Sequence, residues 1–273
     1  MYDFRTPNAT KSIMVRITIA FLKHFFASVN EHGVHSPFLF KLLTQGVYER
    51  NKCSETQIIE RIRKQLKADH SSIQVTDLGA GSVIDGNAKT RSISFICQSF
   101  AKSPKLCGVL HRITKHLQPN NILELGTSLG ISTMYLATAC PSAKVITIEG
   151  CPNTAARARD SFTNAGFQNI ESLVGDFDDV LPSILNRTNC LGLVYIDGNH
   201  TYEATLRYFH LLLPKCGNES CIIFDDIHWS VGMEKAWKEI SNHPKVTMSL
   251  DLFYFGIVFF DSRLSKEHFK IRI

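Results

Sequence analysis

The chain has 273 residues, of which 44% are hydrophobic and 20% are charged, and this composition excludes an intrinsically disordered protein. Its eight cysteines form no C-x-x-C pair, so neither a zinc knuckle nor a small disulfide framework is indicated, and a reducing cytoplasm is the expected location. The most apolar N-terminal run, residues 13–29, is interrupted by Arg16, Lys23 and His24, so no transmembrane segment or signal peptide is expected.

The formal net charge of +5 is unevenly distributed. Residues 1–118 carry 17 Lys and Arg against 8 Asp and Glu, whereas residues 119–273 carry 13 against 17. One interpretation is that the basic residues of the N-terminal part lie on solvated helix faces. The alternative is a surface that attracts an acidic substrate, a membrane face or nucleic acid.

Residues 1–118 read mainly as helices. An amphipathic helix is predicted over residues 11–30, and it should pack against the main domain or against a second subunit in a homodimer. Ser36-Pro37 and Ser103-Pro104 both have the pattern of an N-cap followed by proline at the first helical position. A polar, glycine-rich loop is expected at about residues 71–89. We interpret its glycine turn, Asp77–Ser82, as a loop because no strand ending in an acid follows at the required distance.

The stretch from Asn121 to Gly130 predicts a strand and a tight turn. The short run contains the apolar residues Ile122, Leu123 and Leu125, Gly126 and Gly130 follow it, and apolar residues then recur at helical spacing. Such a turn lets backbone N–H groups approach a nucleotide-like cofactor closely. A second strand ends on Glu149, about 20 residues further on, where dinucleotide-binding folds place an acid on the ribose hydroxyls.

Strands and helices alternate from residue 119 onward, which predicts a parallel sheet with crossover helices. Three further strands end in acidic residues: residues 170–174 before Asp176, residues 191–196 before Asp197, and residues 221–224 before Asp225 and Asp226. The last two apolar runs, residues 246–250 and 252–260, leave no room for a helix between them, so an antiparallel hairpin is expected.

The order ELGTSLG, TIEG, GDF, YIDGNH and FDD on successive strand ends resembles the class I S-adenosylmethionine-dependent methyltransferases. Within that class the chain is similar to the metal-dependent O-methyltransferases that act on catechols and on antibiotic sugars, over about residues 106–260. The resemblance implies an α/β fold, with a Rossmann-like, doubly wound, seven-stranded sheet whose last strand is antiparallel. It also implies three segments: the N-terminal helical region (1–118, a substrate lid or dimerisation element), the cofactor-binding domain (119–261) and a C-terminal tail (262–273).

The resemblance also assigns cofactor contacts. The glycine turn would line the methionine moiety, Glu149 would bind the ribose, and Asp176 and Phe177 would flank the adenine. The complete expected set is Glu124, Gly126, Thr127, Ser128, Gly130, Glu149, Gly150, Asp176, Phe177 and Asp197.

A metal site is expected beside the cofactor. If the strands that precede Asp197 and Asp225 are neighbours, about 4.8 Å apart, Asp197, Asp225 and Asp226 can share one hard cation such as Mg²⁺. A metal-bound hydroxyl has a lower pKa and so becomes a nucleophile near neutral pH. His200 lies where the catechol enzyme carries its lysine base, so either His200 or Asp197 is expected to be the general base.

The predicted function is Mg²⁺-dependent O-methylation of a hydroxyl on a small molecule. RNA ribose O-methylation stays an alternative because of the basic N-terminal part, as does a cofactor-binding protein without catalysis. The spacing Gly126-Thr-Ser-Leu-Gly130 lacks G-x-G-x-x-G, which disfavours an NAD-dependent oxidoreductase. Asp-Gly-Asn-His at residues 197–200 lacks the proline-rich turn expected of a nucleic-acid amino-methyltransferase.

Overall fold

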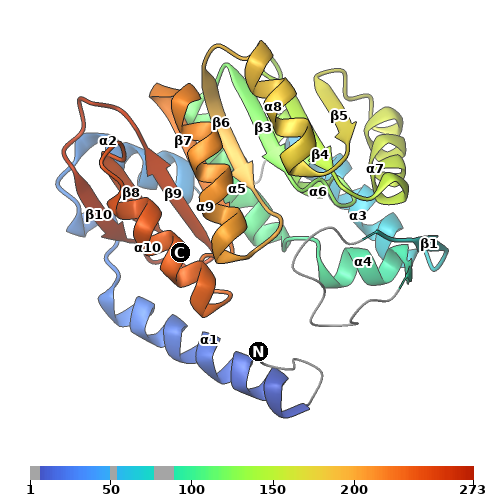
Figure 1. Cartoon of the computed structure of the whole chain (residues 1–273), viewed down its shortest axis with the longest axis horizontal. Coiled ribbons are helices and arrows are strands. Elements are labelled where there is room, and N and C mark those ends of the chain that lie inside the picture. Colours follow the sequence, from blue (N-terminus) through green and yellow to red (C-terminus); the bar gives the residue numbers. More distant parts are fainter. Residues whose placement is uncertain (1–6, 50–53, 77–88) are drawn as a thin grey trace.

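A mostly parallel sheet of eight strands forms the centre of the protein (Figure 1). The computed structural model describes residues 7–49, 54–76 and 89–273, with side chains from residue 14 onward. The strand order is β10-β8-β9-β7-β6-β3-β4-β5, and β9 alone runs antiparallel to its neighbours. The strands are β3 (Asn121–Leu125), β4 (Lys144–Glu149), β5 (Ile170–Val174), β6 (Leu191–Ile196), β7 (Cys216–Asp225), β8 (Met248–Asp251), β9 (Phe255–Phe259) and β10 (Glu267–Lys270).

The apolar runs in the sequence form the central strands, as predicted. β6 is buried along nearly its whole length and lies between β3 and β7, so both of its faces are covered. Side chains that point to either face of such a strand must be apolar, which explains the uninterrupted run before Asp197. The carboxyl ends of β3, β4, β5, β6 and β7 consequently lie at one edge of the sheet.

Helices cover the two faces of the sheet (Figure 1). One layer contains α5 (Pro104–Leu117), α6 (Ile131–Ala139) and α7 (Pro152–Asn164), and the other contains α8 (Phe177–Arg187), α9 (Tyr202–Leu212) and α10 (Val231–Asn242). Two hydrophobic clusters fill the space between the sheet and these layers. This arrangement is the doubly wound fold that the alternation of strands and helices predicts.

The N-terminal region is helical, as expected, with one small addition. Its helices are α1 (Pro7–Ala27), α2 (Pro37–Lys41, continued by a π-helical turn, Leu42–Val47), α3 (Gln57–Ala68) and α4 (Ile93–Ser99), with single 3₁₀ turns at Glu31–Gly33 and Ser54–Thr56. Ser36 Oγ accepts a hydrogen bond from Leu39 N at 3.3 Å, which confirms the predicted N-cap. The short strands β1 (Ser72–Gln74) and β2 (Thr90–Ser92) pair with each other. The glycine turn Asp77–Ser82 lies outside the described residues.

The C-terminal segment gives the sheet an eighth strand, where seven were predicted. The expected hairpin is present as β8 and β9, and β10 then pairs with β8 in parallel. β10 contains only four residues of mixed polarity, so no apolar run marks it in the sequence. Val29 N donates to Lys270 O and Arg272 N donates to Val29 O, so the segment that follows α1 meets the C-terminal segment at this edge. Among the described residues, no helix has the length and hydrophobicity that a membrane span requires.

Candidate active site

The glycine turn between β3 and α6 is held close to the end of β6. A Cβ atom on Gly126 would lie 2.0 Å from Asp197 O, and the φ of Gly126 is +105°, so a side chain is excluded on two grounds. Gly130 caps α6 with φ +79°, and a Cβ there would meet the Phe162 ring at 2.4 Å. The backbone of the turn therefore lies at the edge of the sheet without side chains at these two positions.

Glu149 lies against this turn, as its position at the end of β4 predicts. Its Oε2 accepts a hydrogen bond from Ser128 N at 2.8 Å, and its Oε1 accepts one from Cys151 N at 2.9 Å. Thr127 turns away, because its hydroxyl forms a 2.6 Å hydrogen bond with the Thr147 hydroxyl in the core. Any contact of Thr127 with a cofactor would therefore be made by its backbone.

Glu124 is completely buried below the turn. Thr133 and Thr147 donate hydrogen bonds to its Oε2, whereas its Oε1 has no hydrogen-bond partner within residues 7–49, 54–76 and 89–273. Burial raises the pKa of Glu124 to about 7, although the threonine hydrogen bonds oppose this. A buried carboxylate oxygen without a donor is costly, and a hydrogen-bond donor of the cofactor would remove this cost. The expected contact of Glu124 with the cofactor stays a prediction.

Replacing Glu124 by glutamine is expected to change the pH dependence of stability. Because its pKa is higher in the folded protein than in the unfolded chain, the stability it contributes is complete below about pH 4.5 and is lost as the pH rises through about 7. Between pH 5 and pH 8, the Tm of Glu124→Gln should therefore rise by several degrees relative to the Tm of the wild type. Thermal unfolding followed by circular dichroism without cofactor measures it.

Glu171 provides the control for this change. It forms ion pairs with Lys144 and Arg187, both at 2.6 Å, and the hydrogen bonds of these partners lower its pKa. Glu171→Gln should therefore show no gain relative to the wild type as the pH rises. A Glu124→Gln difference that stays constant with pH would show that Glu124 does not titrate in this range.

The expected adenine contacts lie at the end of β5. Asp176 caps α8, accepting a hydrogen bond from Asp178 N at 2.8 Å. The Phe177 ring packs against Tyr208 and lies close to Gly198, where an added Cβ would be 2.9 Å away. Gly150 follows β4 directly. Phe177 and Asp176 thus lie at the same edge of the sheet as the glycine turn. Their contact with adenine stays a prediction.

Asp197 and His200 lie together just beyond the end of β6. His200 Nε2 is 3.4 Å from Asp197 Oδ1, and Tyr195 Oη donates to Asp197 Oδ2 at 3.1 Å. Burial alone would raise the pKa of Asp197, but Lys102 and His200 outweigh it and lower the pKa. Burial opposes the charged form of His200, yet the hydrogen bond and charge of Asp197 raise its pKa above the usual value.

A lysine lies among three aspartates at the ends of β6 and β7. We call these aspartates (Asp197, Asp225 and Asp226) the acidic cluster. Lys102 Nζ contacts Asp225 Oδ2 and lies 3.3 Å from Asp226 Oδ1. Burial raises the pKa of Asp225, as do the neighbouring carboxylates, and Lys102 opposes this only in part. Burial alone would lower the pKa of Lys102, but the three aspartates raise it well above its usual range, so this side chain is a fixed cation.

The acidic cluster therefore attracts a cation, as the sequence predicts, but the cation in contact with it is the Lys102 ammonium group. A divalent ion would fit between Asp225 and Asp226 only after this side chain had moved. The Mg²⁺ site stays a prediction. Lys102 comes from the turn before α5, and no spacing signal in the sequence connects that turn with the ends of β6 and β7.

Comparison with known proteins supports a methyltransferase. Residues 123–227 match a family model described as a methyltransferase domain. The human transmembrane O-methyltransferase is 33% identical over 114 residues, which are 39% of this chain and 39% of that protein. A catechol O-methyltransferase from Niastella koreensis is 32% identical over 147 residues, covering 53% of this chain and 64% of that protein. The chain thus spans less than two thirds of the length of these relatives.

Solved structures show the same fold. The O-methyltransferase TomG from Streptomyces achromogenes, in complex with SAM, is 22% identical and has a TM-score of 0.52, covering 60% of this chain and 82% of that one. An O-methyltransferase from Bacillus cereus in complex with SAH is 18% identical with a TM-score of 0.55, covering 78% and 93%. These structures show the Rossmann-like fold, and the family model and the sequence relatives support the resemblance to the S-adenosylmethionine-dependent O-methyltransferases.

Proposed function

We propose that this chain transfers the methyl group of S-adenosylmethionine to a hydroxyl oxygen of a small molecule. The observation that carries the proposal is the meeting of three features at one sheet edge: the glycine turn, the Asp197–His200 pair and the acidic cluster with Lys102. The O-methyltransferase relatives support the choice of oxygen as the acceptor atom. They also favour a small molecule over RNA, since one of them is named for its action on catechol.

The reaction needs little chemistry from the protein. The hydroxyl oxygen forms a bond to the methyl carbon, the carbon–sulfur bond breaks, and its electron pair stays on sulfur. The hydroxyl proton goes to a base, for which we propose the neutral form of His200, held in place by Asp197. Positioning of the two reactants supplies much of the remaining rate enhancement.

We further propose that Lys102 supplies the positive charge of this site. An ammonium group placed between the buried carboxylate of Asp225 and the partly exposed one of Asp226 can stabilise an acceptor oxygen as its negative charge develops. The alternative from the sequence is Mg²⁺ bound by Asp197, Asp225 and Asp226, which would lower the pKa of the acceptor hydroxyl. The contact between Lys102 and two of these aspartates favours the lysine.

Cofactor binding should be visible as thermal stabilisation. S-adenosylhomocysteine at about 100 times its Kd should stabilise the folded protein by about 2.7 kcal/mol, which raises Tm by about 5–10 °C for a chain of this size. NAD at the same concentration should leave Tm unchanged. A shift with NAD and none with S-adenosylhomocysteine would remove the methyltransferase proposal.

Two glycine variants locate this binding. Gly126→Ala places a Cβ 2.0 Å from Asp197 O and should abolish the shift, because the turn must move. Gly166→Ala is the matched control: φ there is +77°, so backbone strain is similar, but nothing lies within 4 Å of the added Cβ. Equal shifts in both variants would mean that the cofactor binds elsewhere.

The N-terminal helices are proposed to form a substrate lid or a dimerisation element. α1 leaves several large apolar side chains exposed, which is consistent with a homodimer; these are Met14, Val15, Ile19, Leu22 and Phe26. A cytoplasmic location stays a prediction from the cysteine pattern.

A further inference from the structure

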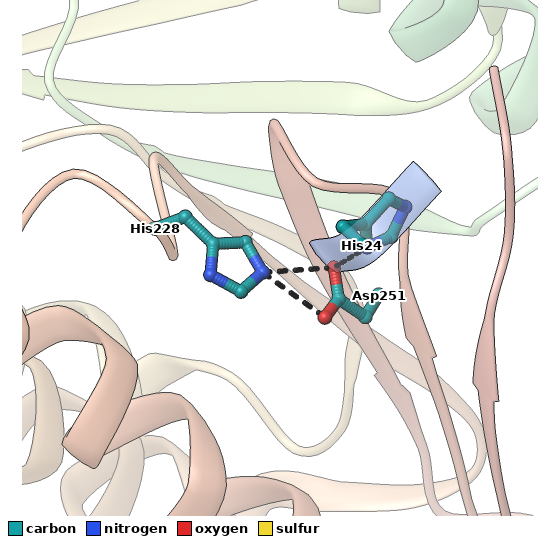
Figure 2. Close-up of side chains that lie close together, drawn as sticks. All are labelled: His24, His228 and Asp251. Carbon is teal, nitrogen blue, oxygen red and sulfur yellow. Dashed lines mark hydrogen bonds and ion pairs between the residues drawn. The ribbon is translucent and has the colours of Figure 1, made fainter. Parts of the chain in front are cut away.

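Two histidines and an aspartate from distant parts of the chain meet outside the candidate active site (Figure 2). His24 lies on α1, His228 follows β7, and Asp251 ends β8. Each offers one ligand atom, and these atoms all lie within 4.8 Å of one another. We call this group the histidine cluster, and none of its members belongs to the acidic cluster.

The distances within the histidine cluster suit a metal ion. His24 Nδ1 lies 3.2 Å from Asp251 Oδ1, and His228 Nε2 lies 3.0 Å from Asp251 Oδ2. Ligand atoms about 2.0–2.1 Å from a tetrahedral zinc ion are separated from one another by about 3.3 Å. The two nitrogen–oxygen separations are close to that edge length, and all the ligand atoms lie within 4.8 Å of one another, so the three side chains can converge on one ion.

The outer nitrogens of both rings already have partners. His24 Nε2 lies 3.1 Å from Ile271 O, and His228 Nδ1 lies 3.3 Å from Glu234 Oε1. Metal-binding histidines commonly donate their second ring N–H to a backbone carbonyl or a carboxylate, which fixes the tautomer and aims the other nitrogen at the metal. With these tautomers, His24 Nδ1 and His228 Nε2 both direct lone pairs toward the carboxylate of Asp251.

His24 is almost completely buried at this position. Its side chain is only 5% exposed, and Nδ1 has Asp251 Oδ1 as its partner at 3.2 Å. A cation bound between the ring and the carboxylate would replace this contact by two metal–ligand bonds. The Phe253 ring stacks on His228 at 4.9 Å and lies 5.6 Å from His24, so an apolar wall shields the position.

We propose that His24, His228 and Asp251 bind one Zn²⁺ ion, which fastens α1 to the sheet. Imidazole ligands select zinc and similar transition ions, whereas Mg²⁺ prefers oxygen ligands, so this site is distinct from the predicted magnesium site. α1 otherwise contacts this region through Arg16, which pairs with Glu234 at 3.3 Å, and through Phe21 on Phe253. The ion joins three segments that are far apart in sequence, and a water molecule takes the fourth position of the tetrahedron.

The test uses the full-length protein, stripped with a chelator and then supplied with Zn²⁺ or Mg²⁺. Elemental analysis after gel filtration should find about one equivalent of zinc, and Zn²⁺ should raise Tm while Mg²⁺ does not. Co²⁺ in place of zinc should give the visible absorption of a four-coordinate site. None of these readouts depends on methyl transfer, so they succeed or fail independently of the proposed function.

Variants assign the ion to the cluster. His228→Gln and Asp251→Asn should each lose the bound zinc and the Zn²⁺-dependent rise in Tm. His268→Gln is the matched control, because His268 lies on the neighbouring strand β10 and contacts Ser249 of β8 at 2.7 Å, outside the cluster. Wild-type protein that retains no zinc and has the same Tm with Zn²⁺ as with chelator would overturn the proposal. Undiminished zinc in both cluster variants would do so as well.

Discussion

Lys102→Ala is expected to lower kcat by about 100- to 1000-fold, the range found when one preorganised charge-stabilising group is removed from an active site. The variant loses the ammonium group that contacts Asp225 and Asp226, so the acidic cluster keeps its negative charges without a cation. Removing one partner of a buried ion pair also costs about 3–5 kcal/mol of stability, so activity must be measured below the Tm of the variant. Lys105→Ala, an exposed lysine in the first turn of α5, is the matched control and should behave as the wild type.

A chelator distinguishes the two possible cations. If Lys102 supplies the positive charge, wild-type activity should be the same in EDTA as in Mg²⁺. In Lys102→Ala the aspartates are no longer engaged by the lysine, so added Mg²⁺ should restore part of the lost activity. Wild-type activity that disappears in EDTA and returns with Mg²⁺ would instead favour the sequence-based magnesium site, with Lys102 moving away.

The second large effect is expected at Asp197 and His200. His200→Gln removes the proposed base and should lower kcat by about 100- to 10,000-fold, the usual contribution of general acid–base catalysis. His210→Gln, an exposed histidine on α9, should have no effect and serves as its control. Activity of His200→Gln within a few fold of the wild type would remove His200 from the reaction.

The pH profile tests the same pair by a readout that loss of structure would not mimic. A base acts in its neutral form, so activity should rise with pH through the raised pKa of His200. Although burial opposes it, the hydrogen bond and charge of Asp197 raise that pKa. In Asp197→Asn this support is lost, so the pKa of His200 should fall and the rise in activity should shift to lower pH, at a reduced maximum. An unchanged position of this rise would show that another group titrates.

The sequence predicted those elements whose pattern is local and strong. The apolar runs of β3, β4 and β6 and the proline-marked start of α5 have the expected positions. The short strands β1, β2 and β10 were missed because three or four residues of mixed polarity carry no periodic signal. Their pairing is set by neighbouring segments, which local propensity does not describe.

The candidate site shows the same division. Glu149, Asp197 and Asp225 were found because they end buried strands, and the parallel sheet necessarily brings such ends to one edge. Lys102 and His24 were missed because each reaches its partners from a segment far away in the sequence. His228 lies in the histidine cluster, where Glu234 contacts its Nδ1 and Asp251 contacts its Nε2.

The central claim is that a sulfonium donor and a hydroxyl acceptor meet beside Asp197. Mass spectrometry of hydroxylated small molecules incubated with the purified protein and methyl-labelled S-adenosylmethionine tests it most directly. We expect at least one acceptor to gain the labelled methyl group with an equal yield of S-adenosylhomocysteine, and Gly126→Ala to abolish both products while Gly166→Ala retains them. Labelled product that forms at the same rate with Gly126→Ala, or S-adenosylhomocysteine binding that leaves every hydroxyl unmethylated, would contradict the account.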